Sequence, residues 1–337
     1  MIVFRGGTVV DYASDTLDTR DIFVEKGKIV KLARSDQFPA EGDFEIIDIS
    51  GLHVMPGFID LHSHLREPGY EWKEDIVSGT KAAAAGGFTS VVCMANTDPV
   101  NDNPEITRYI IEKARKKGLV KVFPVASITH NLEGKELTDF GELLESGAIA
   151  LSDDGKPIMD SLIMMRAMDY SKMFDALLIL HEEDAGLSEG GCMNEGETSA
   201  VLGLTGVPPV SEEIMIARDI LLAEYTGARI HIAHLSTKRG IDLIRDAKER
   251  GVRVTAETAP HYLTLTEREV LGYNTKAKMN PPLRKEDDRR ALLAAIVDGT
   301  IECVATDHAP HEDLVKSCEF EEAANGIIGF QTAFPLL

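Results

Sequence analysis

Two histidines two residues apart, His62 and His64, end an apolar run in the segment MPGFIDLHSHLREPG, residues 55–69. Residues i and i+2 of a strand point to the same face, so both imidazoles would enter one space. Converging imidazoles suit a divalent metal ion, and Arg66, which has the same parity, suits a carboxylate ligand beside it. The segment therefore indicates a metal and a carboxylate side by side; the alternative is a half-buried strand with two structural histidines.

Other apolar runs of the chain also end in residue types that bind metals. Each such residue is preceded at alternate positions by small or apolar residues; His234, for example, has the parity of Ile230 and Ile232. Four histidines and two carboxylates exceed what one tetrahedral zinc ion needs and suit two metals that share a bridging carboxylate and hydroxide. We predict a metal site, with one or two ions and two favoured, formed by His62, His64, Asp154, His181, His234 and Asp307.

Several neighbouring residues are expected to support this site. Asp60 lies on the same strand face as the first two histidines and is a candidate to orient an imidazole. His231 has no matching partner in the pattern and is expected to be structural, whereas His261 could line the cavity. His308 is expected to support the loop after Asp307, and His311 could reach a substrate from that loop.

A repeating pattern of apolar run, polar tip and amphipathic helix must position these residues. It starts near Leu52, and its eight runs end near His64, Asn96, Thr129, Asp154, His181, His234, His261 and Asp307. Strands that alternate with helices imply right-handed βαβ units. Eight units favour a (β/α)8 TIM barrel over an open sheet, whose glycine-rich phosphate loop is missing here. Residues at the C-terminal ends of barrel strands converge on one cavity.

Residues 1–52 differ from the rest of the chain. Asp21 to Ala33 holds two β-prone runs around Glu25-Lys26-Gly27, which predicts a hairpin, and residues 44–49 form another β-prone run. We therefore predict a small N-terminal β domain at residues 1–52, which is too small to hold a core alone, and the barrel at residues 53–337.

Composition narrows the possible partners and setting. The chain of 337 residues has 35 Lys+Arg against 56 Asp+Glu, a formal net charge of −21. This excess argues against a nucleic-acid or anionic-membrane surface, and an anionic substrate would need a local cation such as Arg66. Four scattered cysteines and the lack of a signal peptide or long apolar run predict a cytoplasmic protein with no membrane segment.

Seven short motifs resemble those of dihydroorotases, within the bacterial class I branch of the cyclic-amidohydrolase superfamily. They occur in order from about Gly51 onward as DLHSHLREPG, MANT, SDDGKP, HEED, AHLSTK, MNPPLR and ATDHAPH. The resemblance implies zinc-dependent, reversible hydrolysis of (S)-dihydroorotate to N-carbamoyl-L-aspartate in pyrimidine biosynthesis. It also implies a (β/α)8 barrel with a small β-sandwich.

The resemblance further implies a role for each matching residue. His62 and His64 would bind one zinc ion, His181 and His234 the other, and Asp154 would bridge the two. Asp307 would ligate the metal and act as the catalytic proton shuttle. Arg66, Asn96 and His311 would bind the substrate carboxylate. Asn280 and the backbone near Ala324 and Gly326 would contact the substrate ring.

Two departures from the family pattern leave alternatives open. Asp154 stands where hydantoinases have a carboxylated lysine, which disfavours hydantoinase activity. The chain ends within the expected eighth helix, so the C-terminal strands that complete the sandwich are expected to be absent. The alternatives are another cyclic amidase, such as an allantoinase or hydantoinase, and a non-catalytic partner of aspartate transcarbamoylase. We also expect a homo-oligomer, with aspartate transcarbamoylase as a possible partner.

Overall fold

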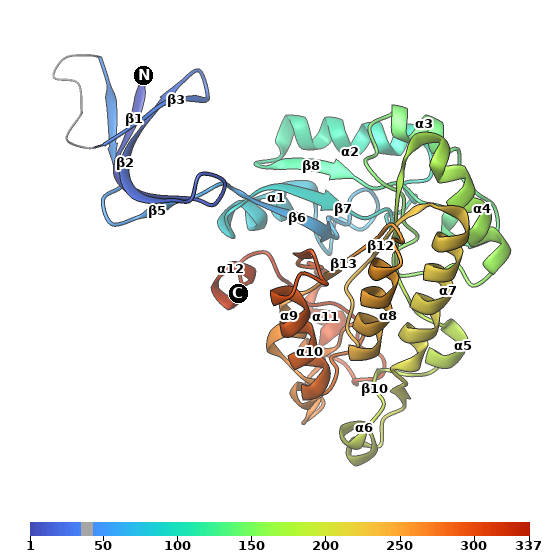
Figure 1. The fold of residues 1–337 in the computed structure, drawn as a ribbon. Helices are drawn as coiled ribbons and strands as arrows, with labels where there is room; N and C mark the ends of the chain where they lie inside the picture. The colour runs from blue at the N-terminus through green and yellow to red at the C-terminus, as the bar shows by residue number, and fades with distance from the viewer. Residues whose placement is uncertain (35–42) are drawn as a thin grey trace. The chain divides into compact units, whose positions relative to one another are not determined.

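The computed structural model describes residues 1–34 and 43–337 and divides into two compact units, Met1–Phe58 and Ile59–Leu337 (Figure 1). The division lies after Phe58, whereas the sequence placed it after residue 52. The difference arises because β5 (His53–Val54) pairs with the first strand of the N-terminal unit.

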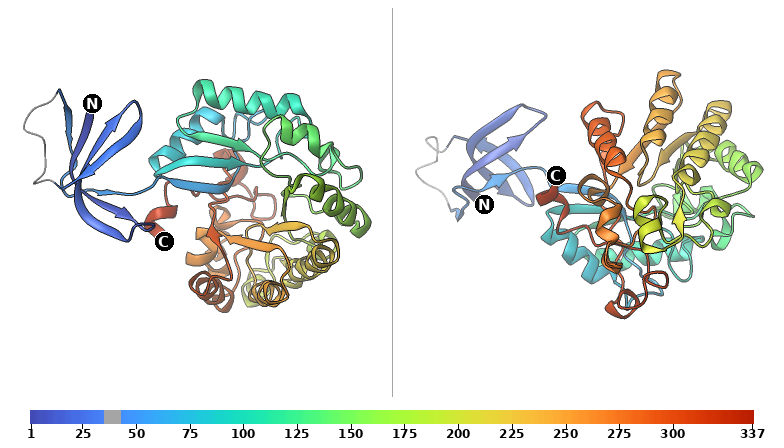
Figure 2. Two further views of the ribbon diagram at one scale, coloured as in Figure 1. Left: turned by 45° about the horizontal axis from the view of Figure 1, so that its top comes forward. Right: turned by 90° about the horizontal axis from the view of Figure 1, so that it is seen from below.

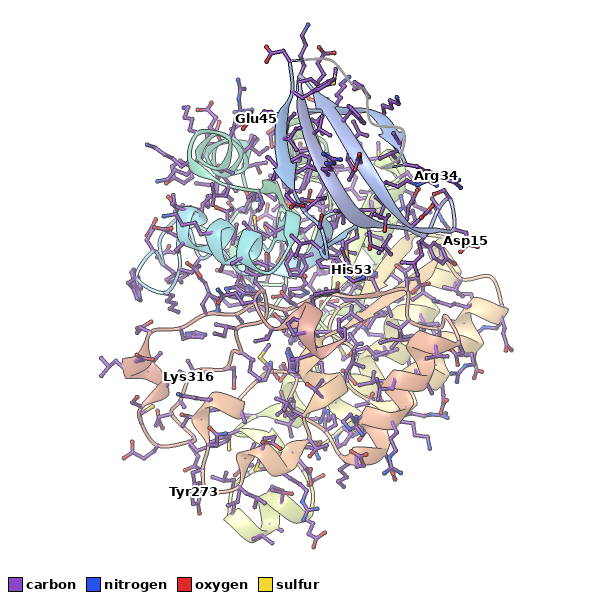
Figure 3. The ribbon with its side chains drawn as sticks, turned by 90° about the vertical axis from the view of Figure 1, so that its left-hand side faces the viewer. Asp15, Arg34, Glu45, His53, Tyr273 and Lys316 are labelled. Atoms are coloured by element: carbon purple, nitrogen blue, oxygen red, sulfur yellow. The ribbon has the colours of Figure 1, made fainter. Side chains whose placement is uncertain are left out.

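The N-terminal unit is a five-stranded sheet (Figure 3). Its central strand β1 (Ile2–Asp11) pairs antiparallel with β2 (Thr16–Glu25) and parallel with β4 (Glu45–Asp48) and β5. The predicted hairpin is confirmed, because β2 pairs antiparallel with β3 (Lys28–Ala33). Lys26 and Gly27 between them have φ angles of 50° and 74°, as a two-residue turn that follows the strand twist requires.

One face of this sheet is packed and much of the remainder is exposed. Val3, Phe23 and Ala33 form a small buried cluster, against which the ring of Phe44 packs edge-on at a centroid distance of 6.0 Å. In contrast, apolar side chains of β3 and β4 stay exposed, among them Ile29, Val30, Leu32 and Ile46. The unit thus has a small core, while several apolar side chains of its strands are exposed.

The C-terminal unit is an α/β structure with two sheets. One has the strand order β6 (Phe58–Ser63), β7 (Phe88–Cys93), β8 (Lys121–Pro124); the other has the order β14 (Cys303–Val304), β13 (Val254–Thr258), β12 (Arg229–Ile232), β9 (Leu177–Leu180). Isolated parallel bridges join Ala126 to Leu151, Leu151 to Leu178, and Ser63 to His308. Bridges therefore connect the two sheets on both sides. A short pair, β10 (Met193–Asn194) and β11 (Gly206–Val207), lies in the loop after β9.

The longer helices lie on the outer side of the strands (Figure 2). They are α1 (Ile76–Ala85), α2 (Pro104–Lys117), α4 (Ser161–Ser171), α7 (Val210–Thr226), α8 (Lys238–Glu249) and α10 (Glu286–Val297). The shorter helices are α3 (Phe140–Glu145), α5 (Ala185–Ser188), α6 (Glu197–Leu202), α9 (Pro260–Thr264), α11 (Asp313–Lys316) and α12 (Ala333–Leu336). Every helix in the described ranges is too short or too polar to cross a bilayer.

Local sequence signals explain where the main helices begin. The Asn103 side chain accepts hydrogen bonds from the backbone N–H groups of Glu105 and Ile106, and Pro104 opens α2. In α8, Thr237 caps the first turn while Ile241 and Ile244 face the core. These caps fix the point at which each loop ends, and so they limit the freedom of the loops that carry the site.

Two apolar clusters occupy the two sides of the strands. Leu178, Leu180 and Ile230 pack outward with the helices, whereas Ile179 and Ala233 pack inward. Ile230 and Ile232 of β12 therefore face the helices, which corrects the parity expected for His234. His234 reaches the interior because its φ of 34° turns the chain away from the strand path.

Candidate metal centre and active site

The six predicted metal ligands lie together where strands of the C-terminal unit end. His62 belongs to β6, and His181, His234 and Asp307 follow β9, β12 and β14; His64 and Asp154 follow bridged strand segments. All six side chains are buried. The structure thus brings together residues that are up to 245 positions apart in the chain, since Asp307 neighbours His62.

Asp154 is at the centre of the cluster. Its Oδ1 atom lies 3.3 Å from His234 Nε2, 3.5 Å from His62 Nε2 and 3.8 Å from His181 Nδ1, and its Oδ2 atom lies 3.6 Å from His64 Nε2. Burial acts to raise the pKa of the Asp154 carboxyl, but the imidazoles, His62 foremost, outweigh it and hold that pKa well below its usual range. The carboxylate is therefore ionised and available as a ligand.

Asp307 completes a second group of donors. Its Oδ1 atom lies 3.1 Å from His64 Nε2 and 3.6 Å from His62 Nε2. Burial again opposes ionisation, and the charges of His62 and His64 again lower the pKa of this carboxyl below its usual value. The φ of Asp307 is 45°, a rare conformation for a residue other than glycine.

The arrangement of donor atoms fits a metal. The donors of His62, His64 and Asp307 lie within 4.8 Å of one another, and so do those of His62, Asp154 and His234. The buried His62 Nε2 has no hydrogen-bond partner although it points at both carboxylates. A cation between these atoms would satisfy this nitrogen, and nitrogen and oxygen donors of this kind suit Zn²⁺.

Glu257 of β13 supports His62 from beneath the cluster. Its Oε1 atom is 2.7 Å from His62 Nδ1, its Oε2 atom is 3.3 Å from His231 Nε2, and His231 Nδ1 is 2.8 Å from Thr255 Oγ1. The sequence did not predict that Glu257 contacts His62, nor that His231 has Glu257 as a partner. The available signal was an ionisable residue within the buried strand VTAET.

Asp60 does not play the role expected of it. Its carboxylate accepts hydrogen bonds from the Thr306 backbone N–H at 2.7 Å and from the Thr306 hydroxyl at 2.8 Å. Asp60 therefore anchors the residue before Asp307 instead of an imidazole, and Glu257 has the orienting position. The expectation failed because parity gives the face of a strand but not which neighbour is nearest.

Two further polar residues contact the remaining ring nitrogens of His64 and His181. The Asn96 carbonyl oxygen is 3.0 Å from His64 Nδ1, and its Nδ2 lies 3.3 Å from Asp154 Oδ2. On the other side, Glu183 Oε2 is 2.9 Å from His181 Nε2 and accepts a hydrogen bond from Asn280 Nδ2 at 2.8 Å. Burial raises the pKa of Glu183, but the His181 contact outweighs it and lowers that pKa to about 2.

A cavity of about 260 Å³ opens above the cluster. Its lining includes Arg66, Asn96, Asn280, His311 and Asn325, together with five of the six predicted ligands, His64, Asp154, His181, His234 and Asp307. Arg66 Nη2 lies 3.4 Å from His311 Nε2, and His311 Nε2 donates to the Asn325 carbonyl at 2.9 Å. The cavity therefore has a cationic side above an acidic, histidine-rich floor.

The loop at residues 324–326 meets the cavity differently from the expectation. The Ala324 N–H donates to the Val315 carbonyl, and the Gly326 N–H donates to the Lys278 carbonyl, both at 3.0 Å. Asn325 between them is the residue that lines the cavity. A Cβ atom at Gly326 would come within 2.3 Å of the Ala309 carbonyl oxygen, so this turn requires glycine.

The remaining histidines are outside the cavity lining. His308 Nδ1 accepts a hydrogen bond from the Gly329 N–H at 3.1 Å, and its ring stacks on Phe330, so it supports the loop as expected. His261 is buried in α9, and burial lowers its imidazole pKa to about 4.

Solved structures with this architecture define the class of protein. The L-hydantoinase (dihydropyrimidinase) from Arthrobacter aurescens superposes with a TM-score of 0.85 at 22% identity, over 99% of this chain and 76% of that one. A D-hydantoinase from Bacillus sp. AR9 has a TM-score of 0.79 at 26% identity, over 98% and 74% of the two chains. The fold is thus that of hydrolases of cyclic amides.

Sequence relatives define the family within that class. Residues 51–240 match the family described as dihydro-orotase-like. A dihydroorotase from Trichlorobacter lovleyi is 53% identical and one from Syntrophus aciditrophicus is 51% identical, each over 335 residues that cover 99% of this chain and 78% of the relative. The chain belongs to the dihydroorotase family.

Proposed function

We propose that the chain is a dihydroorotase, which hydrolyses the ring amide of (S)-dihydroorotate to N-carbamoyl-L-aspartate and catalyses the reverse cyclisation in pyrimidine biosynthesis. The observation that carries this proposal is the cavity in which Arg66 lies above the cluster of four histidines and two aspartates. A guanidinium binds a carboxylate through two planar hydrogen bonds, and the substrate carries a carboxylate beside its reactive ring. The identity to curated dihydroorotases over nearly the whole chain supports the same activity.

The donor cluster supports zinc as the metal, with two ions favoured. His62 and His64 would hold one ion, His181 and His234 the other, and Asp154, which faces all four imidazoles, would lie between them. When bound, zinc would acidify water and polarise the scissile carbonyl. Glu257 and Glu183 would keep the rings of His62 and His181 in the orientation that presents a nitrogen to the ion.

Asp307 would move the proton that the reaction requires. It borders the cavity and lies on the floor beside His64. It would accept the proton of the attacking water and deliver it to the ring nitrogen, since an amide nitrogen leaves readily only once it is protonated. Arg66, Asn96 and His311 would hold the substrate carboxylate, and Asn280 with the loop at Asn325 would contact the ring.

The strand pairing supports a closed (β/α)8 barrel. Isolated parallel bridges join the two sheets through Leu151 on one side and through Ser63 and His308 on the other, as expected of a sheet that closes on itself. The exposed apolar residues of β3 and β4 support the N-terminal unit as half of a composite β-sandwich. A homo-oligomer, an aspartate transcarbamoylase partner and a cytoplasmic setting remain predictions.

Turnover of defined substrates tests the proposal. We expect the purified protein to hydrolyse dihydroorotate, to lose this activity with a chelator, and to regain it with added zinc. Hydrolysis of hydantoin or allantoin at an equal or greater rate would replace the proposal with another cyclic amidase. Tight zinc binding without any turnover would favour a non-catalytic partner protein instead.

A further inference from the structure

One carboxylate of the site contacts both a predicted metal ligand and a predicted substrate contact. Glu183 Oε2 is 2.9 Å from His181 Nε2 and 2.8 Å from Asn280 Nδ2. The Glu183 side chain is largely buried, with 18% of its surface exposed, and His181 is almost completely buried. Neither contact was expected from the sequence, where Glu183 is only the third residue of the motif HEED.

The shared oxygen determines the proton positions of both partners. A carboxylate accepts hydrogen bonds and donates none, so the nitrogen of each partner must be the donor. His181 must therefore carry its proton on Nε2, which leaves the lone pair of Nδ1 directed to the donor cluster, where Nδ1 lies 2.9 Å from His234 Nε2 and 3.8 Å from Asp154 Oδ1. Asn280 directs its NH2 group to Glu183 at 2.8 Å, which turns its carbonyl Oδ1 to the opposite side of the amide, and Asn280 lines the cavity.

We propose that Glu183 is a positioning residue that sets the His181 tautomer and the Asn280 amide orientation together, so that the site recognises a ring N–H. This inference rests on the proposed function and specifies how its ring subsite discriminates ligands. An amide carbonyl at this position accepts a hydrogen bond from the N–H groups of dihydroorotate. It repels a ring carbonyl or a ring nitrogen that lacks its proton, because two acceptors would then face each other.

Four variants test this role. Glu183→Ala removes the shared acceptor at a partly exposed site, and Glu183→Gln restores one acceptor oxygen without the charge. Asn280→Ala removes the ring contact alone. Glu189→Ala is the matched control, because Glu189 is an exposed glutamate of the same loop. Zinc affinity is measured by competition with a chelator, and inhibition constants are measured for dihydroorotate analogues with and without a methyl group on each ring nitrogen.

Substitution of Glu183 is expected to change both zinc affinity and analogue preference, whereas substitution of Asn280 is expected to change only analogue preference. Glu183→Ala should weaken zinc binding by about 10- to 100-fold, as loss of a carboxylate that orients a metal-bound histidine does. It should also reduce the preference for an unmethylated analogue from about tenfold to near unity, because the freed amide can turn. Glu183→Gln should recover part of both effects, and Asn280→Ala should lose only the analogue preference.

Two results would overturn the inference. One is a Glu183→Ala protein with the zinc affinity and analogue preference of the Glu189→Ala control. The other is a Glu183→Ala protein that loses zinc affinity but retains the full analogue preference, which would make Glu183 a support for His181 alone. Failure of the wild-type protein to turn over dihydroorotate would reject the proposed function instead, and the zinc measurement would still test the contact to His181.

Discussion

At the scale of single residues, the two aspartates of the centre share a chemistry but occupy different surroundings. The two carboxylate oxygens of Asp154 face four imidazoles. A carboxylate in this position could connect the two pairs of histidines through bound metal ions. Asp307 contacts His62 and His64 through one oxygen and borders the cavity. The same carboxyl group therefore suits a structural link in the first position and a proton transfer in the second.

Replacement of Asp307 by asparagine separates proton transfer from metal binding. Asp307→Asn keeps the size and one ligand oxygen but removes the basic group, so we expect zinc to remain while turnover falls by about 10²- to 10⁴-fold. Metal analysis and a dihydroorotate assay on the same preparation check this. The control is Asp313→Asn on the exposed part of the same loop. Retention of near-wild-type turnover in Asp307→Asn would move the proton-transfer role to another residue.

Replacement of Glu257 by glutamine tests the support of His62. The carboxylate holds His62 Nδ1 at 2.7 Å and leaves Nε2 for the metal cluster. Glu257→Gln can present a donor where an acceptor is needed, so we expect zinc affinity to fall by about 10- to 100-fold. Chelator competition measures this, with the exposed Glu249→Gln of α8 as the control. Equal affinity in both proteins would show that His62 is oriented without Glu257.

At the scale of elements, the site is built where strands stop being regular. Arg66, His234 and Asp307 have φ angles of 61°, 34° and 45°, values that residues other than glycine seldom adopt. Each lies just beyond the region in which strand parity holds. Left-handed conformations cost energy and persist only where surrounding contacts fix them, and here the neighbouring contacts include the Asp60–Thr306 pair before Asp307.

This irregularity explains which parts of the site could be predicted from the sequence. Residue type and position at the end of an apolar run were sufficient to predict His181 and Asp154, because the segments before them keep the alternation that places Ile179 and Ala150 in the inner cluster. Parity failed for His234, whose neighbours Ile230 and Ile232 face outward, since one positive φ reverses the alternation. Glu257 and Asn325 were missed because their roles depend on neighbours from distant parts of the chain, which no local pattern contains.

Glu67 shows how one element positions another, and its effect should depend on pH. Its carboxylate accepts hydrogen bonds from the Ile76 N–H at the start of α1 and from the Tyr109 hydroxyl of α2, and it pairs with Lys113 at 2.9 Å. Burial raises the pKa of Glu67, but these bonds outweigh it and lower that pKa below 4.5. The folded state then binds fewer protons than the unfolded state at acid pH. This stabilisation is present above pH 4.5 and is lost as the pH falls through the folded value.

Glu67→Gln should therefore lower the free energy of unfolding at pH 7 by about 1–3 kcal/mol, the cost of losing bonds to a buried charged group. The deficit should shrink as the pH falls below 4.5, where the unfolded wild-type carboxyl takes up its proton, and should be smallest below the lowered pKa of the folded state, where the folded carboxyl is protonated as well. The free energy of unfolding is measured by urea denaturation, followed by the fluorescence of Trp72, which is the only tryptophan and lies five residues after Glu67. Exposed Glu145→Gln serves as the control. A deficit that stays constant at every pH would show that Glu67 acts by shape and not by charge.

At the scale of the whole molecule, the donor cluster ties together strands from both sheets. His62 comes from the sheet of β6, β7 and β8, whereas His181 and His234 follow strands of the other sheet. Asp154 follows Leu151, whose bridges link the two. A metal held by these residues would thus connect segments that are otherwise joined at their margins by isolated bridges.

Metal removal should consequently destabilise the C-terminal unit. A ligand bound only by the folded state adds about 2.7 kcal/mol at a free concentration of one hundred times its Kd. We expect a chelator to lower the temperature at which the C-terminal unit unfolds, and added zinc to restore it. Calorimetry with and without chelator measures this shift, and Asp154→Ala, which removes the central carboxylate, should reduce it sharply. A shift of equal size in Asp154→Ala would place the stabilising metal at a different set of residues.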